Sequence, residues 1–185
     1  REAESDAPAP AAVPLPNTDN TRVDRPRCYV LTLSFTIPAN GTATEMGRQL
    51  ALQQTALNAK NPCQAAADIA QYPVNRPIGE RERPRARERY IQADAARIRS
   101  LNPSLSANAA LDMARTAATG KDAIHTLDMV AGGNPMVFSR LGGRSENRSI
   151  GGQWGSGGKV TELATYAKDQ CNNGCPSMQT ALIAS

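Results

Sequence analysis

His125 and Asp128 are the two residues whose types and spacing best suit chemistry on a phosphate group. His125 is the only histidine in the 185 residues, and an imidazole titrates near neutral pH, so it can accept a proton from water. The Asp128 carboxylate is suited to hold a divalent metal or to orient the imidazole. The spacing alone is a weak signal, because a histidine three residues before an aspartate is also common as an ordinary surface pair.

The surrounding pattern predicts a helix over Asp122–Val130. Residues three apart share a helical face, so Asp122, His125 and Asp128 are expected to form one polar stripe. Asp122 either assists this site or, as the simpler interpretation, favours the helix dipole at the N-terminus. The region 132–158 contains nine glycines and is predicted to be a long ordered loop that binds substrate beside the helix.

Further side chains in this glycine-rich region are candidates for holding nucleic acid. Arginine binds phosphate through paired hydrogen bonds, amide side chains position phosphate or base, and tryptophan stacks on a base. Each of them also suits a structural role, such as an amide that pins a loop or a tryptophan that anchors it in the core. The candidates are Arg140, Arg144, Arg148, Asn147, Gln153 and Trp154.

The periodicity elsewhere predicts a mainly α, single-domain helical bundle with at most one short strand or extended arm, at 28–35. The run of alternating charge at 79–89 reads as a solvated helix start rather than a phosphate-binding face, because acids interrupt the bases. Helices are expected from Thr42 or Thr44 to Asn58, over 63–71, over 84–101 after chain breaks at Tyr72-Pro73 and Arg76-Pro77, from Ser104 or Ser106 to Gly120, and over 159–169.

Composition limits the class of protein. The proline-rich residues 1–26 are predicted to be a linker or leader, and 27–185 the folded domain. A net charge of +4 permits nucleic-acid binding without requiring it. The chain has no apolar run of about 18 residues, so no membrane span is expected.

The four cysteines leave their chemistry open. They permit two disulfides, with three possible pairings, or buried free thiols. A zinc site is a poorer fit, because Cys171 and Cys175 supply only two ligands and the single histidine is far away in the sequence. The four are Cys28, Cys63, Cys171 and Cys175.

Two strings in the second half of the chain resemble a bacterial polymorphic-toxin family. Residues 123–135 read AIHTLDMVAGGNP, and Leu141-Gly142 followed by NRSIGGQW at 147–154 continues the likeness. The family is the one called novel toxin fifteen, which is marked by a His-x-x-Asp motif and an all-α fold and includes type VI secretion DNase effectors. The resemblance covers about 120–155 and is thin elsewhere.

The resemblance implies a DNA endonuclease that acts in the cytoplasm of a rival bacterial cell after secretion or injection by the producer. It implies that His125 and Asp128 are catalytic, that a divalent metal such as Mg²⁺ is required, and that a cognate immunity protein blocks the site. A delivery module of the parent toxin or secretion apparatus is the further expected partner. As roles, we expect His125 to activate water and Asp128 to hold the metal or orient His125.

Two other functions fit the same residues. An RNase on this scaffold would use the 2′-hydroxyl of its substrate and need no metal. A non-enzymatic helical adaptor of a secretion system would share the proline-rich leader and the alanine-rich helices. A cysteine peptidase fits poorly, because nothing around the cysteines resembles a nucleophile elbow.

Overall fold

The computed structural model describes residues 28–185, and most of them lie in helices. The predicted single, mainly α domain is confirmed. The predicted linker at 1–26 lies outside the described residues. The helices are α1 (Ala43–Asn58), α2 (Pro62–Ala70), α3 (Tyr72–Leu101), α4 (Ala107–Ala117), α5 (Arg144–Gly155) and α6 (Lys159–Asn172).

Helix starts follow the capping residues of the sequence. The Thr42 side chain accepts a hydrogen bond from the Glu45 amide at the start of α1, and Ser106 accepts one from Ala109 at the start of α4. Each satisfies a backbone donor that the first helical turn leaves unpaired. These two caps confirm two expected helix starts. The helix after Gly158 also starts as predicted, but it ends at Asn172, three residues beyond its predicted end.

Helix α3 is longer than the sequence predicts. The expected breaks near Pro73 and Pro77 are wrong, because a single helix runs from Tyr72 to Leu101 with Pro77 and Pro84 inside it. Each internal proline removes one backbone hydrogen bond, at a cost of about 3 kcal/mol. Tertiary packing offsets this cost, since the second half of α3 buries Ile91 and Ala95.

Four short strands form two separate pairs among the described residues. β1 (Leu31–Phe35) is the strand that the sequence predicts, and it pairs in parallel with β4 (Thr180–Ala184) at the other end of the chain. β2 (Lys121–His125) and β3 (Phe138–Gly143) form an antiparallel hairpin. The chain therefore adds three strands to the one expected, within a fold that stays mainly helical.

The predicted helix over Asp122–Val130 is wrong. Its first half is β2, and its second half is a turn that leads into a single 3₁₀ turn, η1 (Met129–Ala131). Spacings of three and four residues over so short a stretch cannot separate a helix from a buried strand followed by a turn. The turn itself needs glycine: a Cβ on Gly133 would lie 1.9 Å from the carbonyl oxygen of Leu127.

The glycine-rich region is not one long loop either. After a connection over 132–137 it forms β3 and then α5, which contains three glycines of its own. Glycine disfavours a helix by about 1 kcal/mol per residue. The buried side chains of Ile150 and Trp154 hold α5 against the core in spite of that.

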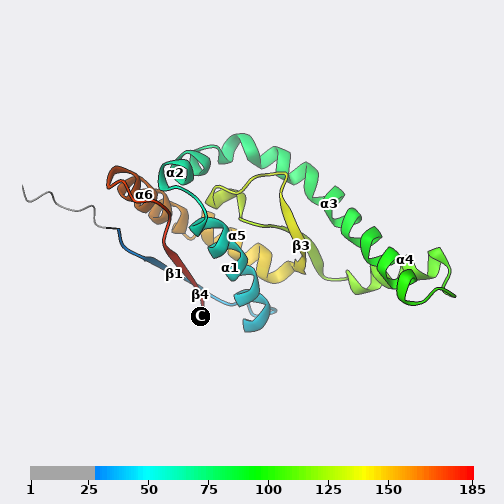
Figure 1. Cartoon of the computed structure of the whole chain (residues 1–185). Helices are drawn as coiled ribbons and strands as arrows, with labels where there is room; N and C mark the ends of the chain where they lie inside the picture. The colour runs from blue at the N-terminus through cyan, green and yellow to red at the C-terminus, as the bar shows by residue number, and fades with distance from the viewer. Residues whose placement is uncertain (1–27) are drawn as a thin grey trace, which may run out of the picture.

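Two hydrophobic clusters organise these elements (Figure 1). The larger one joins β1, β4, α1, α2, α5 and α6 around Phe35, Leu50 and Trp154. The smaller one packs α4 on the C-terminal half of α3, with Ile91 and Ala110 at its centre. Figure 1 shows α3 extending along one side of the molecule to α4 at the far end, and α3 contributes its buried apolar residues to the smaller cluster.

Both cysteine pairs are disulfides, which decides the question that the sequence leaves open. Cys28 is bonded to Cys175, and Cys63 to Cys171. Cys171 and Cys175, the two cysteines that could have supplied two zinc ligands, therefore belong to different disulfides. The first bond ties the start of the described chain to the C-terminal part of the chain, and the second ties the start of α2 to the same part.

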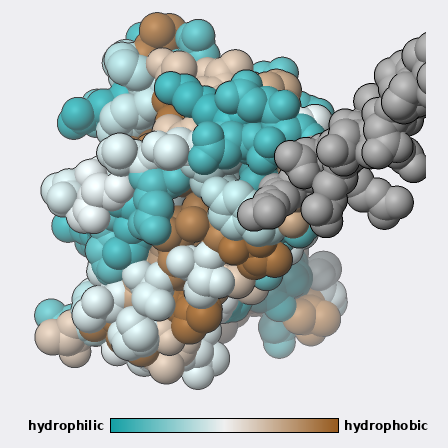
Figure 2. All heavy atoms as spheres, turned by 90° about the vertical axis from the view of Figure 1, so that its left-hand side faces the viewer, coloured by the Kyte–Doolittle hydropathy of each residue, from teal (hydrophilic) through white to brown (hydrophobic). Residues whose placement is uncertain are grey.

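The surface mixes polar and apolar groups. Figure 2 shows hydrophobic side chains in the middle of one face, separated by hydrophilic ones. Exposed apolar residues at the β1–β4 pair include Tyr29, Val30 and Ile183, and scattered exposure of this kind is ordinary for a folded domain. Among residues 28–185, no helix has the length and apolar character needed to cross a bilayer.

Candidate active site

The His-x-x-Asp motif occupies the end of β2 and the turn that follows. His125 is the last residue of β2, and Asp128 caps η1 by accepting a hydrogen bond from the Val130 amide at 2.9 Å. The Asp128 carbonyl accepts two more, from Ala131 and Gly133. The motif residues therefore belong to a strand end and a hydrogen-bonded turn, not to one face of a helix as predicted.

His125 is held in a closed environment, with 7% of its surface exposed. Its Nε2 lies 3.3 Å from the Pro135 carbonyl oxygen, and its ring stacks on Phe138 with centroids 4.1 Å apart. On the other side stands α3, where a Cβ on Gly79 would lie 3.2 Å from Nε2 and 2.2 Å from the Met129 sulfur. A glycine at this position thus lets α3 approach the imidazole.

These contacts indicate which ring nitrogen carries the proton. A carbonyl oxygen only accepts hydrogen bonds, so the neutral imidazole carries its proton on Nε2, facing Pro135. The lone pair is then on Nδ1. Burial lowers the pKa of His125 to about 4, and the positive charge of Arg83 acts in the same direction, against a smaller opposing effect of Pro135. At neutral pH His125 is therefore an uncharged base.

Asp128 is partly buried between α1 and α5. Its backbone amide faces the side-chain oxygen of Gln53 in α1 at 3.5 Å, and the same oxygen accepts a 2.9 Å hydrogen bond from the Trp154 indole. A Cβ on Gly151 of α5 would lie 3.1 Å from the second carboxylate oxygen. Burial raises the pKa of Asp128, and the Val130 hydrogen bond and Arg83 oppose that shift.

Arg83 is a candidate site residue that the sequence analysis did not select. It lies in α3 one turn after Gly79, and its charge acts on both His125 and Asp128. Within residues 28–185, its buried Nε has no hydrogen-bond partner. The run 79–89 was expected to be a solvated helix start, and Arg81 is indeed exposed, but Arg83 faces inward. In the sequence, Arg83 is distinguished only by its position four residues after Gly79. That spacing indicates a role only once α3 is known to cross the β2–β3 hairpin.

The other predicted site residues divide into several groups. Asp122 and Arg144 form an ion pair at 2.9 Å, so each has a structural partner. Arg140 is paired with Ile124 across the hairpin, and neighbouring residues of a strand point to opposite faces, so Arg140 lies on the face away from His125. Arg140 instead lines a second pocket beside Thr126, and its buried Nε, like that of Arg83, has no hydrogen-bond partner within the described residues.

Helix α5 carries the remaining candidates. Trp154 is fully buried in the larger core, so its predicted stacking on a base is wrong and its anchoring role is confirmed. Gln153 bonds the backbone of Thr36 through both ends of its amide and so pins the end of β1. Asn147, partly buried, and Arg148, exposed, lie three or four residues before Gly151, on the side of α5 that approaches Asp128.

The donors at Asp128 fit one kind of divalent cation. In the part of the chain that the structure describes, no three His, Cys, Asp or Glu side chains gather into a metal cluster. Mg²⁺ needs no such cluster, because it commonly binds one or two carboxylates and takes its other ligands from water and substrate phosphate. Asp128, with one oxygen committed to Val130, offers a single carboxylate oxygen for this purpose.

We predict that the imidazole of His125 titrates near pH 4 in the folded protein rather than near its ordinary value of 6.5. Because the folded pKa is depressed, the unfolded chain binds this proton first. The contribution to stability is complete above about pH 6.5 and is lost as the pH falls toward 4, up to about 3 kcal/mol. NMR of the single imidazole measures the midpoint directly.

Chemical denaturation checks the same prediction independently. The free energy of unfolding should fall more steeply between pH 6.5 and 4 for the unmodified protein than for His125→Asn, since no other histidine is present. A midpoint near 6.5, or identical slopes for the two proteins, would show that the imidazole is open to solvent and contradict the site as described.

The comparison with known families matches most of the chain. Residues 41–184, which are 144 of the 185, match the family described as Novel toxin 15. The match defines the chain as a polymorphic toxin domain, a class delivered into target cells and opposed by a cognate immunity protein. The chain belongs to the Novel toxin 15 family, as its sequence resemblance indicates. No curated protein matches the chain.

Proposed function

We propose that this domain is a metal-dependent DNA endonuclease, with His125 as the base and Asp128 as the metal-holding carboxylate. The observation that carries the proposal is the environment of His125: a buried, uncharged imidazole whose Nε2 is committed to Pro135. The charge of Arg83 acts on both His125 and Asp128, and the Nε of Arg83 has no partner within the described residues. A base, a carboxylate and a cation are the parts that phosphodiester cleavage needs.

The proposed reaction proceeds as follows. Nδ1 of His125 takes a proton from water as the water oxygen bonds to phosphorus. The bond from phosphorus to the leaving oxygen breaks, and that oxygen takes a proton from solvent. Arg83 stabilises the negative charge that builds on the phosphate oxygens. Mg²⁺, when bound at Asp128, supplies Lewis-acid polarisation of the phosphate.

Substrate class is tested by offering DNA and RNA side by side. Supercoiled plasmid and a single-stranded RNA of similar mass are incubated with the protein, each in Mg²⁺ and in EDTA. Nicking of DNA in Mg²⁺ alone supports the proposal. Cleavage of RNA in EDTA would establish an RNase, and no cleavage of either nucleic acid would favour the non-enzymatic adaptor.

We predict that Arg83→Gln lowers DNA cleavage by about 10²-fold or more, because loss of one transition-state charge partner commonly costs that much. The matched control is Arg81→Gln, an exposed arginine two residues earlier in the same helix, which should cleave as the unmodified protein does. Initial rates on a labelled duplex measure both. Equal rates for the two variants would remove Arg83 from the mechanism.

The same proposal assigns partners and place of action. The substrate is DNA in the cytoplasm of the target cell, and the delivery module is a further part of the parent toxin or of the secretion apparatus, such as a type VI system. Two disulfides are typical of proteins that pass through an oxidising environment, as a domain in transit between cells would. The immunity protein would block access to the His125–Asp128 turn.

A further inference from the structure

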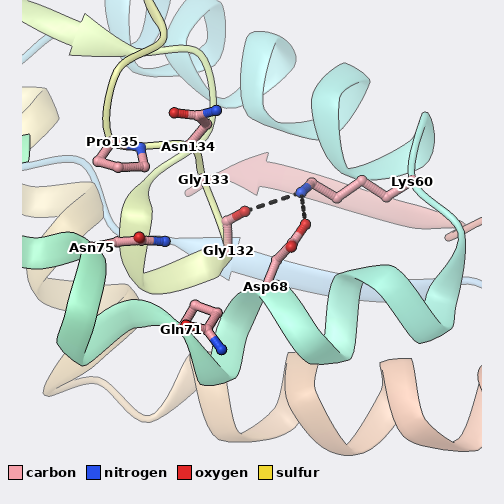
Figure 3. A pocket seen from close by; sticks show the side chains of 8 residues that line it. All are labelled: Lys60, Asp68, Gln71, Asn75, Gly132, Gly133, Asn134 and Pro135. Atoms are coloured by element: carbon pink, nitrogen blue, oxygen red, sulfur yellow. Dashed lines mark hydrogen bonds and ion pairs between the residues drawn. The ribbon is translucent and has the colours of Figure 1, made fainter.

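A polar pocket lies against the loop 132–135, which follows the His-x-x-Asp turn in the sequence (Figure 3). It has a volume of about 290 Å³ and is formed where the end of α2 and the start of α3 face the loop 132–135. The size suits one small planar group rather than an extended ligand. It is lined by Lys60, Asp68, Gln71, Asn75, Gly132, Gly133, Asn134 and Pro135.

The pocket and the proposed catalytic base share a residue. Pro135 forms part of the pocket wall, and its carbonyl oxygen is the atom 3.3 Å from Nε2 of His125. A ligand in the pocket would therefore be separated from the imidazole of His125 by one residue, Pro135.

The charges in the pocket are already balanced. The ammonium of Lys60 is paired with Asp68 and also donates a 3.0 Å hydrogen bond to the Gly132 carbonyl, as the dashed lines of Figure 3 show. Gln64 donates to the other oxygen of Asp68. A neutralised pair does not attract a phosphate group, whereas Arg83 at the catalytic turn does. The pocket therefore suits an uncharged ligand group.

The loop wall has little freedom to move. Gly132 has a φ of +87°, and a Cβ there would lie 3.1 Å from both the Asp68 Cβ and the Ile69 amide. The loop thus lies directly against α2, and its position is fixed by the Lys60 hydrogen bond. The pocket is a preformed feature of the fold.

Two amide side chains remain available for hydrogen bonding. The amide of Asn75 points from α3 toward the loop in Figure 3, and Gln71 lines the pocket one turn earlier. Within residues 28–185 neither side-chain amide makes a hydrogen bond, and Gln71 does not cap α3 with its side chain. An amide presents a donor and an acceptor side by side, which is the pattern of a nucleobase edge.

We infer that this pocket binds one nucleobase of the substrate, from the nucleotide next to the cleaved phosphodiester, and reads it through Gln71 and Asn75. The inference rests on the proposed nuclease function. It assigns the pocket to sequence preference rather than to catalysis, with the phosphate held separately by Arg83. Enzymes that act on nucleic acid often extrude a base into such a pocket and recognise it by hydrogen bonds.

The test is to sequence the cut ends that the protein generates in a random-sequence DNA library. We expect the unmodified protein to prefer particular bases at one position beside the cut. Gln71→Ala/Asn75→Ala should reduce that preference by about tenfold or more while cleaving the library. Asn108→Ala, an exposed amide near the start of α4, is the matched control and should keep the preference.

A binding measurement separates this inference from catalysis. A short oligonucleotide with 2-aminopurine at the preferred position is bound to His125→Ala protein, where its fluorescence should rise as the base leaves the stack, and this rise should be lost when Gln71 and Asn75 are also alanine. Cleavage with no base preference, or a preference unchanged in the double variant, overturns the pocket assignment and leaves the nuclease proposal standing. Absence of DNA cleavage overturns both.

Discussion

His125→Asn is expected to lower the rate of DNA cleavage by about 10²–10⁴-fold, the usual contribution of a positioned general base. Asparagine fits within the space of the imidazole, although its amide nitrogen takes the place of Nδ1 and does not reach the Pro135 carbonyl as Nε2 does. It offers no nitrogen lone pair that takes up a proton. Single-turnover cleavage of a fluorescent duplex under saturating protein measures the chemical step itself.

The control for this substitution is the folded state of the variant. Circular dichroism and the thermal midpoint should show that His125→Asn keeps the fold, because Phe138 and Gly79 still enclose the side chain. Asp112→Asn, an exposed carboxylate on α4, should cleave normally. A folded His125→Asn protein that retains more than about a tenth of the rate would mean that His125 is not the base.

Loss of the disulfides is expected to have the largest effect on stability. The bonds join residues 147 and 108 positions apart, and closing loops of this length restricts the unfolded chain strongly. Each bond is expected to contribute about 2–5 kcal/mol. Denaturant unfolding with and without a thiol reductant measures the sum, and Cys28→Ser/Cys175→Ser and Cys63→Ser/Cys171→Ser separate the two.

Each double variant should retain a second, intact bridge as its internal control. Reductant should then lower the stability of each variant further, toward that of the fully reduced protein. If reductant leaves the denaturation midpoint of the unmodified protein unchanged, the cysteines are free thiols in solution and the pairings are wrong.

The starts of α1 and α4 could be predicted because their signals are local. Caps at Thr42 and Ser106 identify helix starts by the hydrogen bonds that those side chains make within three residues. The β2–β3 hairpin could not be predicted in the same way, because its partner strand lies beyond the turn and the register depends on packing against α3. Short buried segments such as Lys121–His125 lack the length that distinguishes the two periodicities.

The candidate site likewise contains residues that can be identified from the sequence and residues that depend on tertiary packing. The His-x-x-Asp pair could be selected from the sequence, because residue type and motif carry that information without knowledge of the fold. Arg83 could not, since its role arises only when α3 crosses the hairpin at Gly79. Trp154 was assigned to nucleic acid as one of two interpretations, and its burial beside Gln53 decides for the structural one.

The central claim is that His125 and Asp128 together cleave DNA, and a plasmid-nicking assay on three proteins tests it most directly. The unmodified domain should convert supercoiled plasmid to nicked and linear forms in Mg²⁺ and leave it intact in EDTA. His125→Ala and Asp128→Ala should leave it supercoiled in both. Nicking by either folded variant at the rate of the unmodified domain, or an inactive unmodified domain, would contradict the claim.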